Sequence, residues 1–469
     1  MLFNSAIFGL FILIVFPLYM AVRSDSGKKW LLLLASYAFY ANWDVRYLPL
    51  LWISTLVDYT AGARMHAATS TKTRRFWLLA SLVTNLGILG VFKYGNFLIG
   101  QTGSIWAALD ITPPTLPGSI PVGISFYTFQ TMSYTIDIYR RKTTPCGNPL
   151  DFAVYVSFFA QLVAGPIVRA TEFLPQIQKM PRIVGAHVGE GIQRFILGLF
   201  KKVVIADNVG LFVDNVFATP GDFSAPTLWF AAYGFALQIY CDFSGYTDMA
   251  LGIGRAFGLK IPENFNVPYV AVSITDFWRR WHMSLSRWLR DYLYIPLGGS
   301  RLSKILTYRN LMLTMLLGGL WHGAAWTFVI WGGFHGLLLA FERATGLGKA
   351  WEERTHGRFV FWARQIVTFH LVCFAWVIFR AESFGDLSTY VTRMFTEWGW
   401  YDYGERPGLL WAVALAGFVA AQYATVMLSL RTRVWDRLPA PVQGIVLGAL
   451  VVAVGLTQVD EVAFIYFQF

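Results

Sequence analysis

Residues 318–326 read Gly-Gly-Leu-Trp-His-Gly-Ala-Ala-Trp, and they lie inside an otherwise apolar run over about residues 308–342. An ionisable residue is costly in a membrane segment, and by default it indicates a functional site. Small residues on both sides of His322 would allow another helix or a substrate to approach its ring closely. Burial favours the neutral imidazole, which is the form that a general base requires. This stretch therefore makes His322 a candidate catalytic base in a helical membrane protein.

A buried histidine is also often a satisfied core residue, so the residues alone leave that alternative open for His322. His335 and His370 lie in similarly apolar surroundings and are secondary candidates.

The composition of the chain indicates lipid surroundings. Hydrophobic residues make up 56% of the 469 positions and charged residues only 14%, whereas soluble domains carry nearer a quarter of charged residues. The net charge of +11 is distributed in short clusters between apolar runs, which favours cytoplasmic loops over a nucleic-acid surface. Three widely spaced cysteines indicate neither a disulfide framework nor a zinc site. Without a polar linker or repeat, residues 1–469 are predicted to form a single membrane domain.

Apolar runs recur along the whole chain, and about 20 largely apolar residues suffice for a membrane span. The clear runs cover residues 1–22, 76–100, 122–139, 192–206, 228–252, 362–379, 409–430 and 444–458. Basic residues follow the first run instead of preceding it, which predicts a retained transmembrane helix with its amino terminus outside.

Other apolar runs are interrupted. Asn42, Asp44 and Arg46 divide residues 30–62 into two short helices of a predicted hairpin. Ala164-Gly165-Pro166, Gly318-Gly319 and Gly332-Gly333 interrupt further runs. Helix breaks at membrane depth are tolerated where the backbone is buried in protein or lines a cavity. These breaks predict re-entrant helices around an internal site.

The charge of the loops predicts a topology. Residues 64–75 contain four Lys or Arg residues and no acid, so this loop is expected in the cytoplasm, as are residues 140–142 and 431–437. Residues 101–121 contain no Lys or Arg, residues 207–226 hold three aspartates and no base, and residues 382–405 are mostly acidic. These three segments are expected outside.

Residues 273–297 combine an aromatic and an arginine face. Ser273 and Asp276 have the spacing of a capping box, which predicts a helix start. On one continuous helix, the aromatic and leucine side chains would fall on one half, and Arg279, Arg280, Arg287 and Arg290 on the other. The stretch could be only an interfacial anchor. Alternatively, its arginines could hold the phosphates of an anionic donor, with backbone amides around residues 298–300.

Several enzyme classes lose support because their motifs are missing from the sequence. The chain has no G-x-S-x-G elbow, no phosphate-binding P-loop, no H-E-x-x-H pair and no dinucleotide glycine fingerprint with an acidic partner. No histidine precedes an aspartate by five positions, as it does in glycerolipid acyltransferases with soluble active sites.

Around His282 and His322 the sequence resembles the membrane-bound O-acyltransferase (MBOAT) family. Within the family it resembles the bacterial branch of alginate O-acetyltransferases and the teichoic-acid D-alanyl transfer protein. The matching segments are Gln161-Leu-Val-Ala-Gly-Pro166, Asp242-Phe-Ser-Gly-Tyr-Thr-Asp248, Glu263-Asn-Phe-Asn-Val-Pro-Tyr269, Asp276-Phe-Trp-Arg-Arg-Trp-His-Met-Ser-Leu-Ser286, Arg290-Asp-Tyr-Leu-Tyr-Ile-Pro-Leu-Gly-Gly299, Leu320-Trp-His-Gly-Ala324 and the closing Phe464-Ile-Tyr-Phe-Gln-Phe469. They extend from about one third of the chain to its end, and the tryptophan-rich segment is very specific.

The resemblance implies an all-α integral membrane protein of the MBOAT fold, with a ring of about eleven transmembrane helices and re-entrant helices around a central funnel. It implies that His322 is the catalytic histidine and His282 a second, supporting one. The predicted substrate-binding residues are Arg279, Arg280, Trp281, Trp321, Asn264 and Ser286. No metal or bound cofactor is expected.

The function implied is transfer of an acyl group, most simply acetyl, from a cytoplasmic thioester such as acetyl-CoA or an acyl carrier. The acyl group would cross the bacterial inner membrane for O-acetylation of an exported polysaccharide such as alginate. The expected partners are a periplasmic SGNH-type acetyltransferase and the polysaccharide synthesis complex. D-alanyl transfer to teichoic acid and acetylation of peptidoglycan or cellulose remain alternatives, and a lipid or polymer transporter is a remote one.

Overall fold

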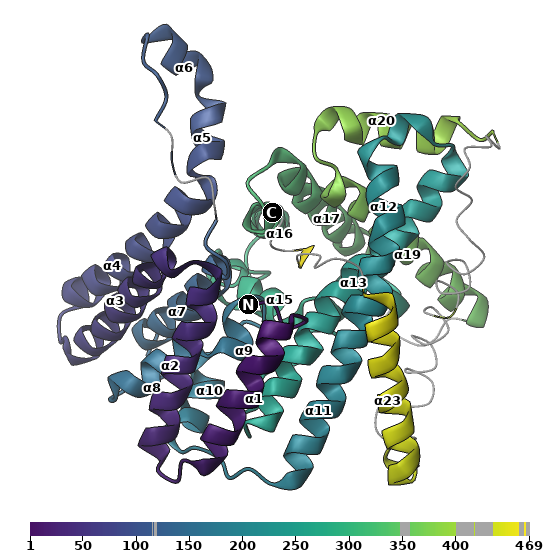
Figure 1. Ribbon diagram of the computed structural model, residues 1–469. Helices are drawn as coiled ribbons and strands as arrows, with labels where there is room; N and C mark the ends of the chain where they lie inside the picture. The colour runs from purple at the N-terminus through teal and green to yellow at the C-terminus, as the bar shows by residue number, and fades with distance from the viewer. Residues whose placement is uncertain are drawn as a thin grey trace. The chain divides into compact units, whose positions relative to one another are not determined.

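The computed structural model describes residues 1–114, 116, 120–347, 357–399, 417, 435–458 and 464–465 (Figure 1). These residues form helices and connecting segments, and no strand occurs among them, which confirms the all-α prediction. They divide into two compact units, Met1–Phe195 with Thr247–Pro262, and Ile196–Tyr246 with Glu263–Phe469. The single domain predicted for residues 1–469 stays a prediction.

The first unit begins with α1 and includes the start of α11. Its elements are α1 (Ala6–Ala21), α2 (Asp25–Asp44), η1 (Val45–Tyr47), α3 (Leu48–Ala67), α4 (Thr71–Leu89), η2 (Gly90–Tyr94), α5 (Gly95–Gln101), α6 (Gly103–Ala108), α7 (Ile124–Tyr139), α8 (Pro149–Ser157), α9 (Phe159–Leu162), α10 (Ala170–Gln178) and α11 (Gly185–Phe200). Two predicted breaks are present: one at η1, where Asp44 accepts a hydrogen bond from the Arg46 N–H, and one between α9 and α10.

Helices α3, α4 and α7 of the first unit lie side by side (Figure 1) and share a buried polar cluster. The Asp58 carboxylate accepts hydrogen bonds from Ser81 Oγ and from Asn85 Nδ2. Thr135 Oγ1 lies 2.9 Å from Ser81 Oγ, and Ser54 Oγ donates to Asn85 Oδ1. Because a buried carboxylate is costly unless it is hydrogen-bonded, these contacts join the three helices at a defined register.

The second unit contains all the predicted site residues. Its elements are η3 (Lys201–Asp207), α12 (Asn208–Ala218), η4 (Pro220–Asp222), most of α13 (Ala225–Ala256), η5 (Pro268–Val270), α14 (Ile274–Arg280), α15 (Met283–Leu289), η6 (Arg290–Tyr294), α16 (Lys304–His322), α17 (Trp326–Thr345), α19 (Arg358–Arg380), α20 (Phe384–Thr396), η7 (Trp435–Arg437) and α23 (Ala440–Thr457).

The glycine pairs at 318–319 and 332–333 lie inside the continuous helices α16 and α17, so the helix breaks predicted there are wrong. A Cβ on Gly319 would lie 2.2 Å from the carbonyl oxygen of Phe328, and one on Gly332 would lie 2.2 Å from that of Met315. The glycines therefore permit close backbone contact between two packed helices. The chain turns instead at residues 323–325, immediately after His322.

Three described helical segments are long and apolar enough to cross a membrane: Thr71–Gln101, Phe359–Arg380 and Ala440–Thr457. They coincide with the predicted runs 76–100, 362–379 and 444–458. The first run corresponds to the shorter apolar helix Ala6–Ala21. The predicted run 409–430 lies outside the described residues apart from residue 417, and the predicted count of about eleven spans stays a prediction.

Candidate active site

His322 is the last residue of α16 and lies at the turn into α17. Gly323 follows it in an extended conformation, and a Cβ on this glycine would lie 2.1 Å from the Phe328 ring. The glycine therefore lets α17 return close to the end of α16, which fixes the place of the imidazole. The His322 side chain is buried, with 4% of its surface exposed.

His282 is fully buried between α14 and α15 and has φ 43° and ψ 52°. This left-handed conformation is uncommon for a residue with a Cβ and must be held by the surrounding structure. The continuous helix predicted over residues 273–297 is therefore wrong, because His282 separates two seven-residue helices. The left-handed turn points the chain in a new direction at the predicted supporting histidine.

The two histidines lie close together, with ring centroids 6.4 Å apart and planes at 63°. Trp321, Trp331 and Phe379 surround His322, with centroids at 5.1, 5.1 and 5.4 Å. Phe243 of α13 lies against His282 at 4.7 Å. This spacing leaves both imidazoles within reach of one small group, inside an apolar aromatic shell that limits access of water. Such a pair suits proton transfer during acyl transfer.

Comparison with known proteins identifies the family of the chain. The model of the membrane-bound O-acyltransferase family matches residues 36–384 of the chain. The chain belongs to the membrane-bound O-acyltransferase family. It is therefore a membrane protein and an acyltransferase, as predicted.

The similar curated relatives include probable alginate O-acetylases. The chain is 44% identical to the probable alginate O-acetylase AlgI of Pseudomonas aeruginosa over 392 residues, which are 82% of this chain and 72% of the relative. It is 42% identical to the probable alginate O-acetylase AlgI of Pseudomonas putida over 452 residues, 94% of this chain and 90% of the relative. The peptidoglycan O-acetyltransferase of Helicobacter pylori is 41% identical over 76% of this chain and 71% of its own length.

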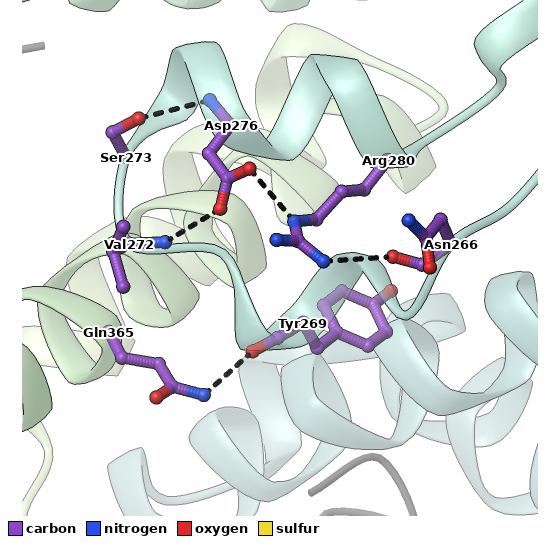
Figure 2. Close-up of polar contacts among 7 residues, drawn as sticks. All are labelled: Asn266, Tyr269, Val272, Ser273, Asp276, Arg280 and Gln365. Carbon is purple, nitrogen blue, oxygen red and sulfur yellow. Dashed lines mark hydrogen bonds and ion pairs between the residues drawn. The ribbon is translucent and has the colours of Figure 1, made fainter. Parts of the chain in front are cut away.

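Helix α14 of this acyltransferase begins after the predicted cap residue Ser273, and Figure 2 shows its contacts. The Asp276 N–H donates to Ser273 Oγ at 3.0 Å, and the Asp276 carboxylate accepts from the Val272 N–H. Arg280 Nε bonds to the same carboxylate at 2.8 Å, and its Nη1 donates to the Asn266 carbonyl oxygen. The predicted donor-binding Arg280 thus also fixes the helix against the preceding loop.

The other arginines of this stretch lie near the surface. Arg279 and Arg290 are exposed, and Arg287 is half-buried. Arg290 forms an ion pair with the neighbouring Asp291 at 2.7 Å. Of the two arginines predicted to bind substrate, Arg279 is therefore the exposed one, whereas Arg280 is half-buried.

The remaining predicted site residues are close to the histidines. Trp321 lies beside both of them, with its ring centroid 6.0 Å from that of His282 and 5.1 Å from that of His322. Trp281 is 1% exposed and packs on Trp376 with centroids 4.9 Å apart. Ser286 Oγ donates to the Trp281 carbonyl oxygen. Asn264 is fully buried, and its Oδ1 lies 3.2 Å from His282 Nδ1.

The secondary candidates differ in position. His335 lies in the same aromatic shell, where its Nδ1 accepts a hydrogen bond from Trp278 Nε1 at 3.3 Å and its ring is 4.9 Å from Trp331. His370 lies on a different helix, α19, and its Nε2 is 2.9 Å from Tyr233 Oη. No group of three or more potential metal ligands occurs within the part of the chain that the structure describes.

Glu342 of α17 belongs to the same region but is not predicted by the sequence motifs. Its carboxylate, 6% exposed, accepts hydrogen bonds from the N–H groups of Ile274 and Thr275 and from Thr275 Oγ1. The carboxylate thus satisfies the first N–H groups of α14, which have no partner within the helix. An acidic residue at the end of the apolar run 308–342 is the signal that could have revealed it.

Proposed function

We propose that this acyltransferase moves an acetyl group from a cytoplasmic thioester, such as acetyl-CoA or an acyl carrier, through the inner membrane for O-acetylation of an exported polysaccharide such as alginate. The observation that supports the reaction is the buried pair of His322 and His282 inside one aromatic shell. The similarity to two probable alginate O-acetylases over most of the chain supports the choice of acetyl and polymer.

In the proposed reaction, His322 accepts the proton of the attacking hydroxyl group. The hydroxyl oxygen bonds to the thioester carbonyl carbon, the carbon–sulfur bond breaks, and the proton passes from the imidazolium to the leaving thiolate. The products are an ester and a free thiol. Because a thioester carbonyl is already electrophilic, the protein mainly has to supply a base and align the reactants. The acceptor hydroxyl belongs to the polymer or to a periplasmic SGNH-type partner that passes the group on.

The arginine face of α14 and η6 supports entry of the thioester from one side. Exposed Arg279 and Arg290 are suited to phosphate groups of a coenzyme or carrier, since guanidinium groups bind phosphates through charge-assisted hydrogen bonds. We place this face in the cytoplasm and the acceptor on the opposite side. Only the acyl end then has to reach His322, so the charged donor need not cross the bilayer.

The test is transfer in sealed vesicles of known orientation, with radiolabelled acetyl-CoA on one side and the partner or polymer on the other. The proposal expects labelled product on the acceptor side, and a His322→Ala variant without product. Product formed only when both substrates are on the same side would contradict the through-membrane route while leaving His322 as the base.

The main alternative is a different acyl group or acceptor, including D-alanyl transfer to teichoic acid or acetylation of peptidoglycan, as the name of the Helicobacter relative indicates for that protein. Separate assays of each donor and acceptor distinguish these alternatives. Acetyl-CoA and a D-alanyl carrier protein are supplied in turn, each with alginate, peptidoglycan or teichoic acid as the acceptor, and the pair that gives the highest kcat/KM identifies the substrates.

A further inference from the structure

The segment around Asn264 runs beside the left-handed turn that carries His282. The Asn264 carbonyl oxygen accepts the Met283 N–H at 2.9 Å, and the Asn266 N–H donates to the Arg280 carbonyl oxygen at 2.9 Å. These two backbone bonds lie on either side of His282. They explain how a residue with a Cβ is held at φ 43°.

The orientation of the Asn264 amide follows from its partners. The Ser284 backbone N–H lies 3.1 Å from one amide atom of Asn264, and a backbone N–H can only donate. The amide atom that faces it must therefore be the oxygen, Oδ1. Ser284 Oγ donates to the same oxygen at 2.9 Å.

That oxygen in turn decides which nitrogen of His282 carries the proton. His282 Nδ1 lies 3.2 Å from Asn264 Oδ1, and an amide oxygen only accepts hydrogen bonds. Nδ1 must therefore be the donor. In a neutral imidazole the other nitrogen, Nε2, is then unprotonated and acts as the acceptor.

We infer that Asn264 is a positioning residue that holds His282 in the Nδ1–H tautomer, so that Nε2 presents a lone pair to the site shared with His322. In this role His282 accepts a hydrogen bond from the substrate hydroxyl or from His322 and cannot act as a neutral donor through Nε2. The inference rests on the proposed function for its consequence in catalysis, and it gives Asn264 a role different from the direct substrate contact predicted from the sequence.

The chain offers well-matched variants. Asn264→Leu removes the acceptor at similar volume, whereas Asn264→Asp keeps an oxygen at the Oδ1 position. Asn264 Nδ2 is buried and has no hydrogen-bond partner within the described residues, so the aspartate removes no bond that these residues make. Asn266→Ala is the control, because the Asn266 side chain is exposed and its two bonds to Arg280 come from the backbone.

In the kinetic test, the full-length variants are reconstituted in vesicles and kcat is measured with acetyl-CoA. Asn264→Leu is expected to lower kcat by about 10- to 100-fold, a part of what a positioned acid–base group contributes. Asn264→Asp retains more activity than the leucine variant, and Asn266→Ala matches the wild type. In a His282→Ala background, Asn264→Leu should cost less than about twofold, since residues that act as a unit are non-additive. An equal loss in both backgrounds would mean that Asn264 does not act through His282.

A spectroscopic test does not depend on activity. Solid-state NMR of the 15N-histidine-labelled protein distinguishes protonated from unprotonated ring nitrogens, and His282→Ala assigns the signal. The inference expects a protonated Nδ1 and an unprotonated Nε2 in the wild type, with a mixture of tautomers in Asn264→Leu. A wild-type His282 protonated only at Nε2 would overturn the inference, even where acyl transfer is intact. Loss of transfer in every reconstitution, with the expected spectrum, would instead count against the proposed function.

Discussion

At the scale of residues, the site consists of two imidazoles that the sequence places 40 positions apart and the structure brings to a ring separation of 6.4 Å. Each is fixed by a local backbone feature: His322 by the glycine that follows it, and His282 by its left-handed conformation beside Asn264. Arg279 and Arg290, which we propose to bind the donor, are exposed and lie outside this apolar shell. Chemistry and donor binding can therefore be altered separately.

His282→Ala should strongly reduce acyl transfer, with a loss in kcat of about 10²-fold or more, because an oriented imidazole next to the base is removed. The KM for the thioester should change little, since His282 is fully buried whereas Arg279 and Arg290, the arginines proposed to bind the donor, are exposed. Steady-state kinetics of the vesicle-reconstituted protein provide the measurement. A variant with wild-type kcat would reduce His282 to a packing residue.

Arg279→Glu should raise the KM for a phosphate-bearing thioester and leave the KM for the acceptor unchanged, because the exposed guanidinium is suited to the donor phosphates. In the wild type, added salt should raise the same KM as the attraction is screened. The variant should have a weaker salt dependence. Arg437→Glu, in the separate element η7, is the control. Equal effects of the two variants on the donor would contradict a local phosphate site at Arg279.

At the scale of elements, the helix start at Ile274 and the apolar character of α16 and α17 follow from their sequences, through the spacing of a capping box and a largely apolar run. The break at His282 could not be predicted in this way. It depends on Asn264, which is distant in sequence and takes the Ser284 N–H out of the helical pattern. The role of the glycine pairs is not predictable from the sequence for a related reason. Glycine permits close helix packing as well as helix breaks, and only tertiary contacts distinguish the two roles.

Gly319→Ala and Gly332→Ala should each destabilise the α16–α17 pair and reduce activity, since the added Cβ would lie 2.2 Å from a backbone carbonyl oxygen of the facing helix. A cost of about 1–3 kcal/mol is typical of overpacking at such contacts. Thermal unfolding of the purified protein measures it. Gly333→Ala is the matched control, because its new Cβ would meet only a Leu316 side-chain carbon at 3.4 Å. The close-packing account fails if all three variants unfold at the wild-type temperature.

Glu342→Ala should loosen α14, because the N–H groups of Ile274 and Thr275 lose their buried acceptor. A loss of roughly 1–3 kcal/mol is expected for buried polar groups left without a partner. Both the unfolding temperature and kcat should fall, since α14 ends beside His282. The comparison variant is Glu382→Ala, whose carboxylate is 82% exposed in its contact with Arg380. Equal stability of the two variants would show that the α14 cap is dispensable.

At the scale of the whole molecule, composition and charge clusters predict a membrane protein, which the family membership confirms. The sequence motifs predict the family and the two histidines that the structure places together. The number of spans and their arrangement around a funnel depend on contacts between distant segments, which a single sequence does not specify, and they remain predictions.

The predicted topology can be tested by cysteine labelling on either side of the helical segment Thr71–Gln101. The three native cysteines are buried, so an impermeant thiol reagent should react mainly with an introduced one. Thr69→Cys should be labelled from the cytoplasmic side and Thr112→Cys from the other, because basic residues favour the cytoplasm. Labelling of both positions from the same side would refute the assignment.

The most direct measurement of the central claim is acyl transfer by His322→Ala in oriented vesicles, beside a wild-type sample of equal yield and unfolding temperature. Removing a general base costs about 10²- to 10⁴-fold in rate, so the variant should form no product above background while it still inserts and purifies normally. His370→Ala serves as the comparison, because this histidine lies beside Tyr233 and outside the His282–His322 pair. It should retain wild-type transfer. Full activity in His322→Ala would contradict the assignment of His322 as the catalytic base.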